Sequence, residues 1–239
     1  MKTVVHNNQT CSFYEIEHKY FVKDIVLLSA TRFVSSFFPT FESGKIAAKY
    51  AKKHGLKKKD VLTQWTTKGE YASEKGHKLH LYAETKLLDM ATPFLNEEWK
   101  GHAQAIDRVL TILHSGYEVI GVELIIFSLN LGLSGTIDLL LKKKRTVDEY
   151  LILDWKTNEK IDFDNSWQHG FPPIEHLDDC DYEHYALQEN IYERILIEEN
   201  YFPNAIYKKV LVHIQPEGNY KLYRVGDYQE NVEAMLSWI

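Results

Sequence analysis

The fold is decided by residues 117–156, which read YEVIGVELIIFSLNLGLSGTIDLLLKKKRTVDEYLILDWK. Three runs rich in apolar and β-branched residues are separated by turn-forming residues at 130–132 and 143–148. Apolar runs bounded by such residues are typical of strands joined by short turns. We therefore expect three sequential strands at the centre of the chain.

Helical patterns lie on both sides of these strands. The further elements that the pattern predicts are a hairpin or pair of edge strands over 12–28, helices over 32–38, 43–54, 67–90 and 182–199, a hairpin over 206–214 and 220–225, and a final helix ending at Trp238. Asp60 is expected to cap a short helical stretch, and Asp227 with Glu230 has the spacing of a capping box. The order of elements predicts an α/β fold with a central mixed sheet flanked by helices.

Composition and charge limit the possible partners. The chain has 239 residues, of which 44% are hydrophobic and 26% charged, which excludes disordered, collagen-like and coiled-coil classes and favours one domain. The formal net charge of -6 provides no overall positive field for nucleic acid or anionic lipid. Lysines do gather around the helix end at Gly55, between Lys52 and Lys59. Either a solvated helix end or a phosphate-binding patch would explain them.

The cysteines and the N-terminus indicate a reducing compartment. Cys11 and Cys180 are too few for a disulfide framework, a structural zinc knuckle or a four-cysteine iron–sulfur cluster, so no such cluster is expected. The sequence begins MKTVVHNNQT, which lacks the apolar stretch of a secretion signal, and no run approaches membrane-spanning length. We expect a cytoplasmic protein, or one in another reducing compartment, with no membrane partner.

The chemistry-bearing residues follow two of the central strands. Asp138 lies in the second run, and Asp154 and Lys156 close the third. Because side chains alternate along a strand, Asp154 and Lys156 project together while Trp155 faces the opposite side. A hairpin would bring Asp138 close to Asp154, where two carboxylates repel unless a cation joins them.

Carboxylate oxygens suit Mg²⁺ or Mn²⁺, and these ions commonly also bind substrate phosphates. Lys156 would then hold or activate the attacking water and offset negative charge, so the residues predict hydrolysis of a phosphodiester. An ordinary ion pair between Asp154 and Lys156 explains the same spacing equally well.

These motifs resemble the RecB-like branch of the PD-(D/E)XK nuclease superfamily, whose signature is a G-x-(I/V)-D strand followed by an apolar strand ending in D-x-K. The family also has G-x-x-x-H on an upstream helix and Q-x-x-x-Y on a downstream helix, which residues 76–80 (GHKLH) and 188–192 (QENIY) match. Four elements in the family's order are more specific than any one of them. The resemblance covers roughly half of the chain closely and implies a restriction-endonuclease-like architecture.

The resemblance also implies the metal ligands. It makes His80 a ligand together with Asp138, Asp154 and the backbone carbonyl of Trp155, while Asp138, Asp154 and Lys156 are the catalytic residues. His77 is the alternative to His80 if the helix register differs.

Residues around this set take supporting roles. The resemblance implies that Gln188 and Tyr192 contact the DNA backbone near the scissile phosphate and orient Lys156. Glu84, which shares a helix face with His80, and Glu123, on the strand before GTID, are expected beside the ligands.

The function that the resemblance implies is a Mg²⁺- or Mn²⁺-dependent DNA nuclease, with exonuclease action on DNA ends and single strands favoured. An endonuclease on DNA or RNA would use the same site, and a nucleic-acid-binding module with a decayed site is a further alternative. DNA is the expected partner, with recombination or repair proteins as candidates. We expect one nuclease domain over 1–239, with the catalytic core at about 67–200, an N-terminal hairpin and helices over 1–66, and a C-terminal hairpin and helix over 201–239.

Overall fold

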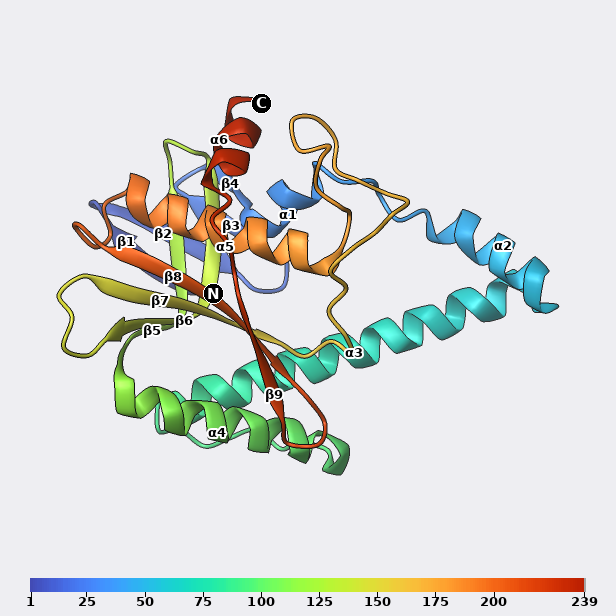
Figure 1. The fold of residues 1–239 in the computed structure, drawn as a ribbon, viewed down its shortest axis with the longest axis horizontal. Coiled ribbons are helices and arrows are strands. Elements are labelled where there is room, and N and C mark those ends of the chain that lie inside the picture. The colour runs from blue at the N-terminus through green and yellow to red at the C-terminus, as the bar shows by residue number, and fades with distance from the viewer. Residues whose placement is uncertain (239) are drawn as a thin grey trace.

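The computed structural model describes residues 1–238, in which nine strands form one mixed sheet (Figure 1). The strands are β1 (Lys2–His6), β2 (Gln9–Tyr14), β3 (Lys19–Val22), β4 (Ile25–Ser29), β5 (Tyr117–Ser128), β6 (Leu133–Lys143), β7 (Glu149–Lys156), β8 (Ile206–Ile214) and β9 (Tyr220–Arg224). Their order is β1-β2-β3-β4-β6-β7-β8-β9, and β5 pairs with β6. The pairs β4–β6 and β7–β8 are parallel, and the other pairs are antiparallel.

Helices flank the sheet. They are α1 (Ala30–Ser35), α2 (Ser43–His54), α3 (Lys58–Leu87), α4 (Lys100–Gly116), α5 (Asp181–Glu198) and α6 (Gln229–Ser237), with a 3₁₀ turn at Glu97–Trp99. One core lies between the sheet and helices α1, α5 and α6, and a second core lies between the sheet and helices α3 and α4. The predicted α/β class, with a central mixed sheet flanked by helices, is confirmed.

Strands β6 and β7 are apolar on both faces because both faces are covered. Leu139 and Leu153 belong to the core beneath α3 and α4, whereas Leu140 and Ile152 belong to the core beneath α1 and α5. Strands that are buried on both sides read as continuous apolar runs rather than as alternating ones. This explains why the central strands could be recognised in the sequence.

The N-terminal prediction was incomplete. The segment forms four strands, and β1 lies before the stretch in which a hairpin or pair of edge strands was expected. β1 pairs on one side only, with β2, and most of its residues are exposed. An edge strand of this kind carries little of the apolar alternation that identifies a strand.

Two helical predictions were wrong in detail. The structure has one helix of 30 residues, α3, in place of a short helix capped by Asp60 and a separate helix over 67–90. Asp60 lies in the first turn, where a negative charge favours the helix dipole. The capping box expected at Asp227 and Glu230 is not formed, because Tyr228 precedes α6 and Asp227 accepts a hydrogen bond from the Gln229 N–H at 3.0 Å.

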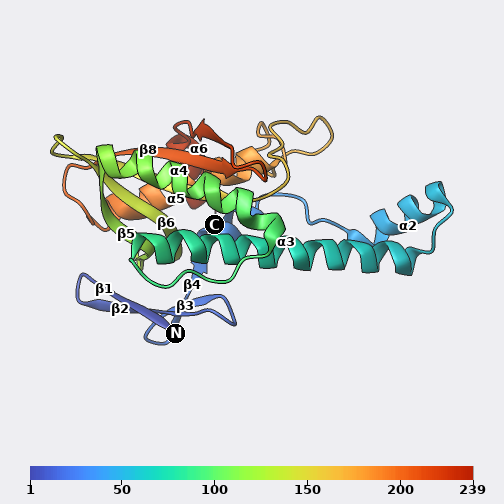
Figure 2. The same ribbon diagram turned by 90° about the horizontal axis from the view of Figure 1, so that it is seen from below.

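Helix α4 has no counterpart among the predicted elements, although Ala103, Ile106 and Leu110 have helical spacing and lie in the core. In contrast, α2 ends as predicted: Gly55 follows it with a left-handed φ of 66°. Figures 1 and 2 show that α2 and the N-terminal half of α3 project away from the sheet as a helical arm. Within residues 1–238, no helix has the length and apolar character needed to cross a membrane.

Candidate active site

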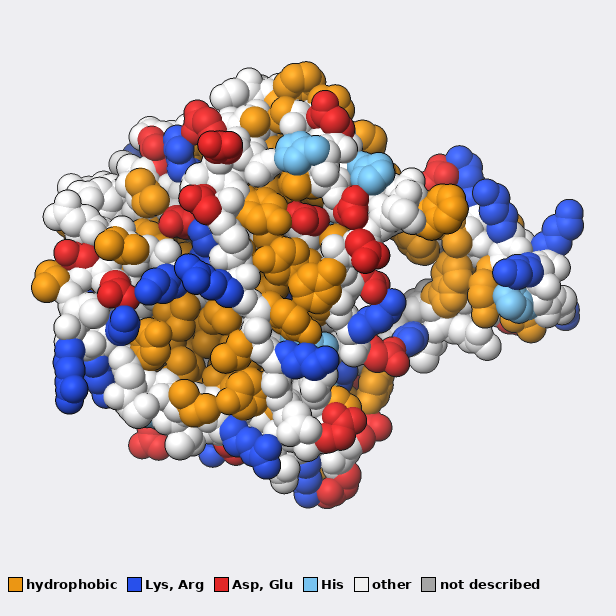
Figure 3. Space-filling model, in the orientation of Figure 1, with side chains coloured by type: hydrophobic (Ala, Val, Ile, Leu, Met, Phe, Trp, Pro, Cys, Tyr) orange, Lys and Arg blue, Asp and Glu red, His pale blue; other side chains and the backbone are white. Residues whose placement is uncertain are grey.

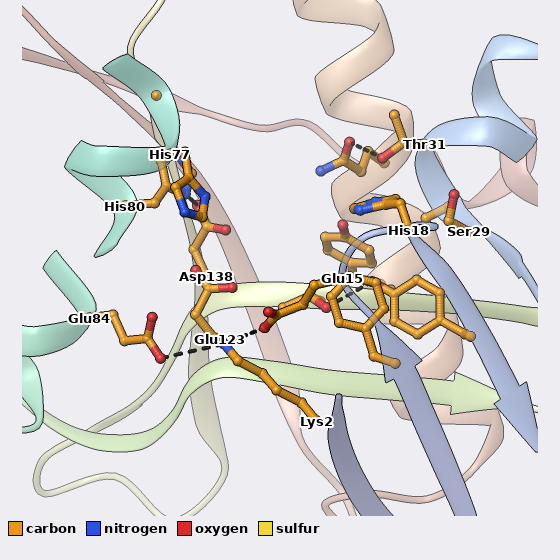
Figure 4. A pocket seen from close by; sticks show the side chains of 18 of the residues that line it. Lys2, Glu15, His18, Ser29, Thr31, His77, His80, Glu84, Glu123 and Asp138 are labelled. Carbon is orange, nitrogen blue, oxygen red and sulfur yellow. Dashed lines mark hydrogen bonds and ion pairs between the residues drawn. The ribbon is translucent and has the colours of Figure 1, made fainter. Parts of the chain in front are cut away.

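A cleft of about 670 Å³ lies between the N-terminal strands and helix α3 (Figure 4). His77, His80 and Glu84 reach it from α3, while Glu123 and Asp138 come from β5 and β6. The opposite wall is formed by residues that were not predicted to line a site, namely Lys2, Phe13, Glu15, His18 and Tyr20. No local sequence pattern identified these residues, because only the folding of β1–β3 beside the central strands brings them to the cleft.

Three potential metal ligands converge in this cleft. Ligand atoms of His80, Glu123 and Asp138 all lie within 4.8 Å of one another. The register pairs Val122 with Leu139 and Leu124 with Ile137, so Glu123 lies opposite Asp138. Glu123 has a left-handed φ of 48°, an uncommon conformation for a residue that is not glycine. The structure therefore brings Glu123 together with His80 and Asp138.

The peptide groups of Trp155 hold two of these side chains in place. The Trp155 N–H donates to Asp138 Oδ2 at 2.8 Å, and the Trp155 carbonyl oxygen lies 3.0 Å from His80 Nε2. His80 Nδ1 lies 3.3 Å from the same Asp138 oxygen. The Trp155 carbonyl, predicted as a metal ligand, is thus at the site, while its indole is buried in the core beneath α3 and α4.

The electrostatics of the cluster follow from burial and from the neighbouring charges. Burial acts to lower the pKa of His80, but the Asp138 carboxylate outweighs it and raises that pKa to about 9. Burial acts to raise the pKa of Asp138, yet His80 and the Trp155 N–H hold it below its ordinary value. Burial, followed by the charge of Asp138, raises the pKa of Glu123 to about 7.

Asp154 and Lys156 form a buried ion pair next to the cluster. Lys156 Nζ lies 2.5 Å from Asp154 Oδ2, and the two side chains are 13% and 8% exposed. Lys156 Nζ also lies 3.8 Å from the ring centre of Tyr185 on α5. Burial raises the pKa of Asp154 to about 6 in spite of Lys156. The two side chains share a face, as the strand alternation predicts, and Asp154 lies outside the group formed by His80, Glu123 and Asp138.

The downstream motif lies on α5. The Thr31 hydroxyl donates to Gln188 Oε1 at 3.1 Å, and both residues line the cleft. Tyr192 also lines the cleft but is only 5% exposed. Its ring packs against Gly135, where an added Cβ would lie 2.3 Å from Tyr192 Cε1.

The upstream motif lies on α3. Glu84 is one turn beyond His80 and lies 3.5 Å from Lys2 Nζ. His77 lines the cleft but is not a member of the candidate ligand group, so the register favours His80. Gly76 lets α3 approach the segment after β7, because a Cβ there would lie 3.2 Å from Thr157 Oγ1.

Glu189 is a buried acid that the sequence did not single out. It is fully buried on α5, and neither carboxylate oxygen has a hydrogen-bond partner among residues 1–238. Burial, followed by the charge of Asp154, raises its pKa well above the ordinary value. Its position beside Gln188 gave no signal, because only the packing of α5 on the sheet buries it.

The donor set fits a divalent cation. Carboxylate oxygens and an imidazole nitrogen within 4.8 Å of one another can bind Mg²⁺ or Mn²⁺, and Mn²⁺ accepts the nitrogen ligand more readily. Burial first, and then the charge of Asp138, disfavour the ionised form of Glu123. A bound cation would relieve the repulsion between the two carboxylates.

Comparisons with known proteins do not assign a family. No protein-family model matches the chain, and no curated protein sequence matches it. A solved structure that is similar to it is the crystal structure of a "putative exonuclease" from Eubacterium rectale, with 13% sequence identity and a TM-score of 0.36. The match covers 84% of this chain and 65% of that chain, so this chain spans less than two thirds of that protein's length.

Proposed function

We propose that the protein is a Mg²⁺- or Mn²⁺-dependent nuclease of the RecB-like PD-(D/E)XK type that hydrolyses DNA. The observation that carries the proposal is the convergence of His80, Glu123 and Asp138 in the cleft, next to the buried Asp154–Lys156 pair. Asp154 and Lys156 themselves are not among the residues that line the cleft. An ordinary surface ion pair would not be buried next to a convergent set of ligands. The site therefore supports metal-assisted hydrolysis better than a structural role.

The chain's own residues have distinct roles in this proposal. His80, Glu123 and Asp138, whose ligand atoms converge, would hold the ion together with the Trp155 carbonyl, and we propose Asp154 as a further ligand. When bound, Mg²⁺ or Mn²⁺ would lower the pKa of a coordinated water and offset negative charge on the phosphate. Trp155 fixes the directions of Asp138 and His80 through its N–H and carbonyl groups.

Lys156 acts as a cation in this site. Burial acts to lower the pKa of its ammonium group, but Asp154 outweighs burial and raises that pKa above the ordinary value. A lysine that stays protonated stabilises the negative charge that develops on phosphate oxygens and orients water, but it is a poor base. Gln188 and Tyr192, which line the cleft from α5, would contact the DNA backbone.

The resemblance of the motifs to the RecB-like branch favours action on a strand end. Strands β1–β3 face α3 across the cleft, so a nucleic acid strand at Asp138 would lie between two walls. We propose exonuclease action with a preference for single-stranded DNA.

The first test compares the wild-type chain with Lys156→Ala on linear and circular single-stranded DNA in Mn²⁺ and in Mg²⁺, with each linear end labelled in turn. Lys142→Ala, which removes a lysine from β6 outside the cleft, is the matched control. Cleavage of linear DNA that Lys156→Ala abolishes and Lys142→Ala retains would support the proposal. Equal cleavage of circles would establish an endonuclease instead. No cleavage with either metal would refute the nuclease function.

A further inference from the structure

The positive charge of this acidic protein is concentrated on the helical arm, which we define as residues 43–69. The arm contains eight lysines and one aspartate, so its formal charge is +7. Because the whole chain carries -6, the remaining residues together carry -13. The net charge of the arm would therefore attract a nucleic acid, whereas the net charge of the remaining residues would not.

The lysines gather at the end of the arm that is farthest from the sheet, as Figure 3 shows. We call this group the lysine tip; it consists of Lys49, Lys52, Lys53, Lys57, Lys58 and Lys59, all of which are exposed. Among residues 1–238, none of the six forms an ion pair with an acidic side chain. The other two arm lysines are paired, Lys45 with Glu42 and Lys68 with Glu159. The charge of the tip is thus uncompensated within the described structure.

The arm is a stable support for these charges. Ala47, Ala51 and Val61 form a small core between α2 and α3, with Leu62 and Trp65 packed against it. The core fixes the two helices to each other, and the left-handed Gly55 makes the turn between them. A hairpin with its own core presents its lysines in fixed positions, which a frayed helix end would not do.

Helix α3 connects the lysine tip to the candidate active site without a break. Lys58 and His80 both lie on α3, 22 positions apart. At 1.5 Å per residue, this separation corresponds to about 33 Å along the helix. A stacked strand advances about 3.4 Å per nucleotide, so about ten nucleotides would span the distance.

We propose that the lysine tip binds the phosphate backbone of the substrate about ten nucleotides from the bond that is cleaved. The inference rests on the nuclease function proposed above and extends it to a second contact region on the same substrate. A linear polyanion can touch the tip and the cleft together, whereas an anionic membrane would also meet the acidic remainder of the surface. The observed charge distribution therefore favours nucleic acid over a lipid surface.

The experiment compares two triple variants. The tip variant is Lys52→Gln/Lys53→Gln/Lys57→Gln. The β6–β7 variant is Lys142→Gln/Lys144→Gln/Arg145→Gln, which removes three charges from the end of β6 and the turn that follows it. Binding of labelled 30-nucleotide and 6-nucleotide single strands is measured by fluorescence anisotropy in EDTA, over a range of salt concentrations. Each phosphate contact contributes about 0.7 to the slope of log K against log salt, so three lost contacts lower the slope by about 2. At 0.1 M salt this corresponds to about 100-fold weaker binding of the 30-nucleotide strand.

The two strand lengths and the control locate the effect. We expect the tip variant to bind the 30-nucleotide strand more weakly than the wild type does, with a lower salt slope. We expect no comparable loss of affinity with the 6-nucleotide strand or with the β6–β7 variant. Equal weakening by both variants, an unchanged slope for the tip variant, or no binding of the long strand by the wild-type chain would overturn the proposal. Tip-dependent binding to phosphatidylserine vesicles without binding to the 30-nucleotide strand would replace nucleic acid with a membrane.

Cleavage assays separate this proposal from the function on which it rests. If the wild-type chain cleaves DNA and the tip variant binds the long strand as tightly as the wild type, the nuclease function stands and the tip proposal fails. If the tip binds the strand but no metal supports cleavage, nucleic-acid binding at the tip stands, while the nuclease function and the ten-nucleotide distance to a cleaved bond both fail. Thermal unfolding of both triple variants confirms that they are folded.

Discussion

Replacing Gly135 with alanine should destabilise the protein by pushing helix α5 away from strand β6. Gly135 is buried on β6, three residues before Asp138. An alanine Cβ would lie 2.3 Å from Tyr192 Cε1, 3.0 Å from Cδ1 and 3.2 Å from Cζ. Because ordinary contacts lie at about 3.5–4.0 Å, the ring or the helix must move by more than about 1 Å.

The magnitude follows from overpacking. Inserting a methyl group into a filled core costs about 1–3 kcal/mol, and replacing a strand glycine returns about 0.5–1 kcal/mol through the unfolded chain. Tyr192 is 5% exposed and belongs to the core beneath α1 and α5, so its ring cannot swing into solvent without losing this packing. Because the 2.3 Å approach puts the overpacking cost in the upper half of its range, at about 2–3 kcal/mol, we expect a net loss of about 1–2.5 kcal/mol. This loss lowers the melting temperature by about 2–10 °C in a chain of this size.

Urea and thermal unfolding of four variants test this expectation. Gly135→Ala is compared with Tyr192→Leu and with the double variant, in which the shorter side chain relieves the clash and the two losses become non-additive. Gly69→Ala is the matched control, because an added Cβ there meets nothing within 4 Å and alanine favours the helix by up to about 1 kcal/mol. If Gly135→Ala unfolds like the wild type, or if the losses are additive, α5 does not pack on β6 as described.

Three further outcomes are expected. Burial lowers the pKa of His102 from 6.5 to about 4, so the unfolded chain binds one more proton than the folded chain between these values and the free energy of unfolding decreases as the pH is lowered. In urea unfolding this group should make the free energy of unfolding about 2 kcal/mol smaller at pH 5 than at pH 8, and His102→Gln should reduce that difference. Burial raises the pKa of the Cys11 thiol from 9.0 to about 11, which lowers the fraction of thiolate about 100-fold. In the Cys180→Ser variant, iodoacetamide at pH 8 should therefore label Cys11 only after the protein has been unfolded. Mn²⁺ at about 100 times its Kd should stabilise the wild type by about 2.7 kcal/mol in thermal melts. If Glu123→Gln weakens Mn²⁺ binding tenfold, it should remove about 1.3 kcal/mol of this stabilisation, whereas Glu84→Gln should retain all of it.

The sequence was most informative where a pattern reflects one local cause. The strands around Asp138 and Asp154 are buried on both faces and read as apolar runs, so their ends could be located to within a few residues. The helical spacing of residues 188–192 likewise placed Gln188 and Tyr192 together on α5. These elements position most of the candidate site.

What could not be predicted depends on long-range packing. Lys2 and His18 reach the cleft only because β1–β3 fold beside α3, and their local sequence contains no signal for that arrangement. The burial of Glu189 follows from how α5 lies on the sheet rather than from its helical position. The continuity of α3 was missed because Thr66, Thr67 and Gly69 are weak helix formers, whereas packing against α2 and the flanking turns outweighs propensity.

The core and the candidate site depend on the same residue. The indole of Trp155 fills the core beneath α3 and α4, while its N–H and carbonyl groups contact Asp138 and His80. Pairing of β7 with β8, in which Trp155 lies opposite Val212, fixes the direction of those peptide groups. The placement of two candidate ligands is thus set by the sheet itself rather than by a flexible loop, which is the condition under which a site keeps its geometry before substrate arrives. His80 completes the arrangement from α3, the helix whose other end begins within the lysine tip, so a strand held at the tip would be aligned with a rigidly placed centre.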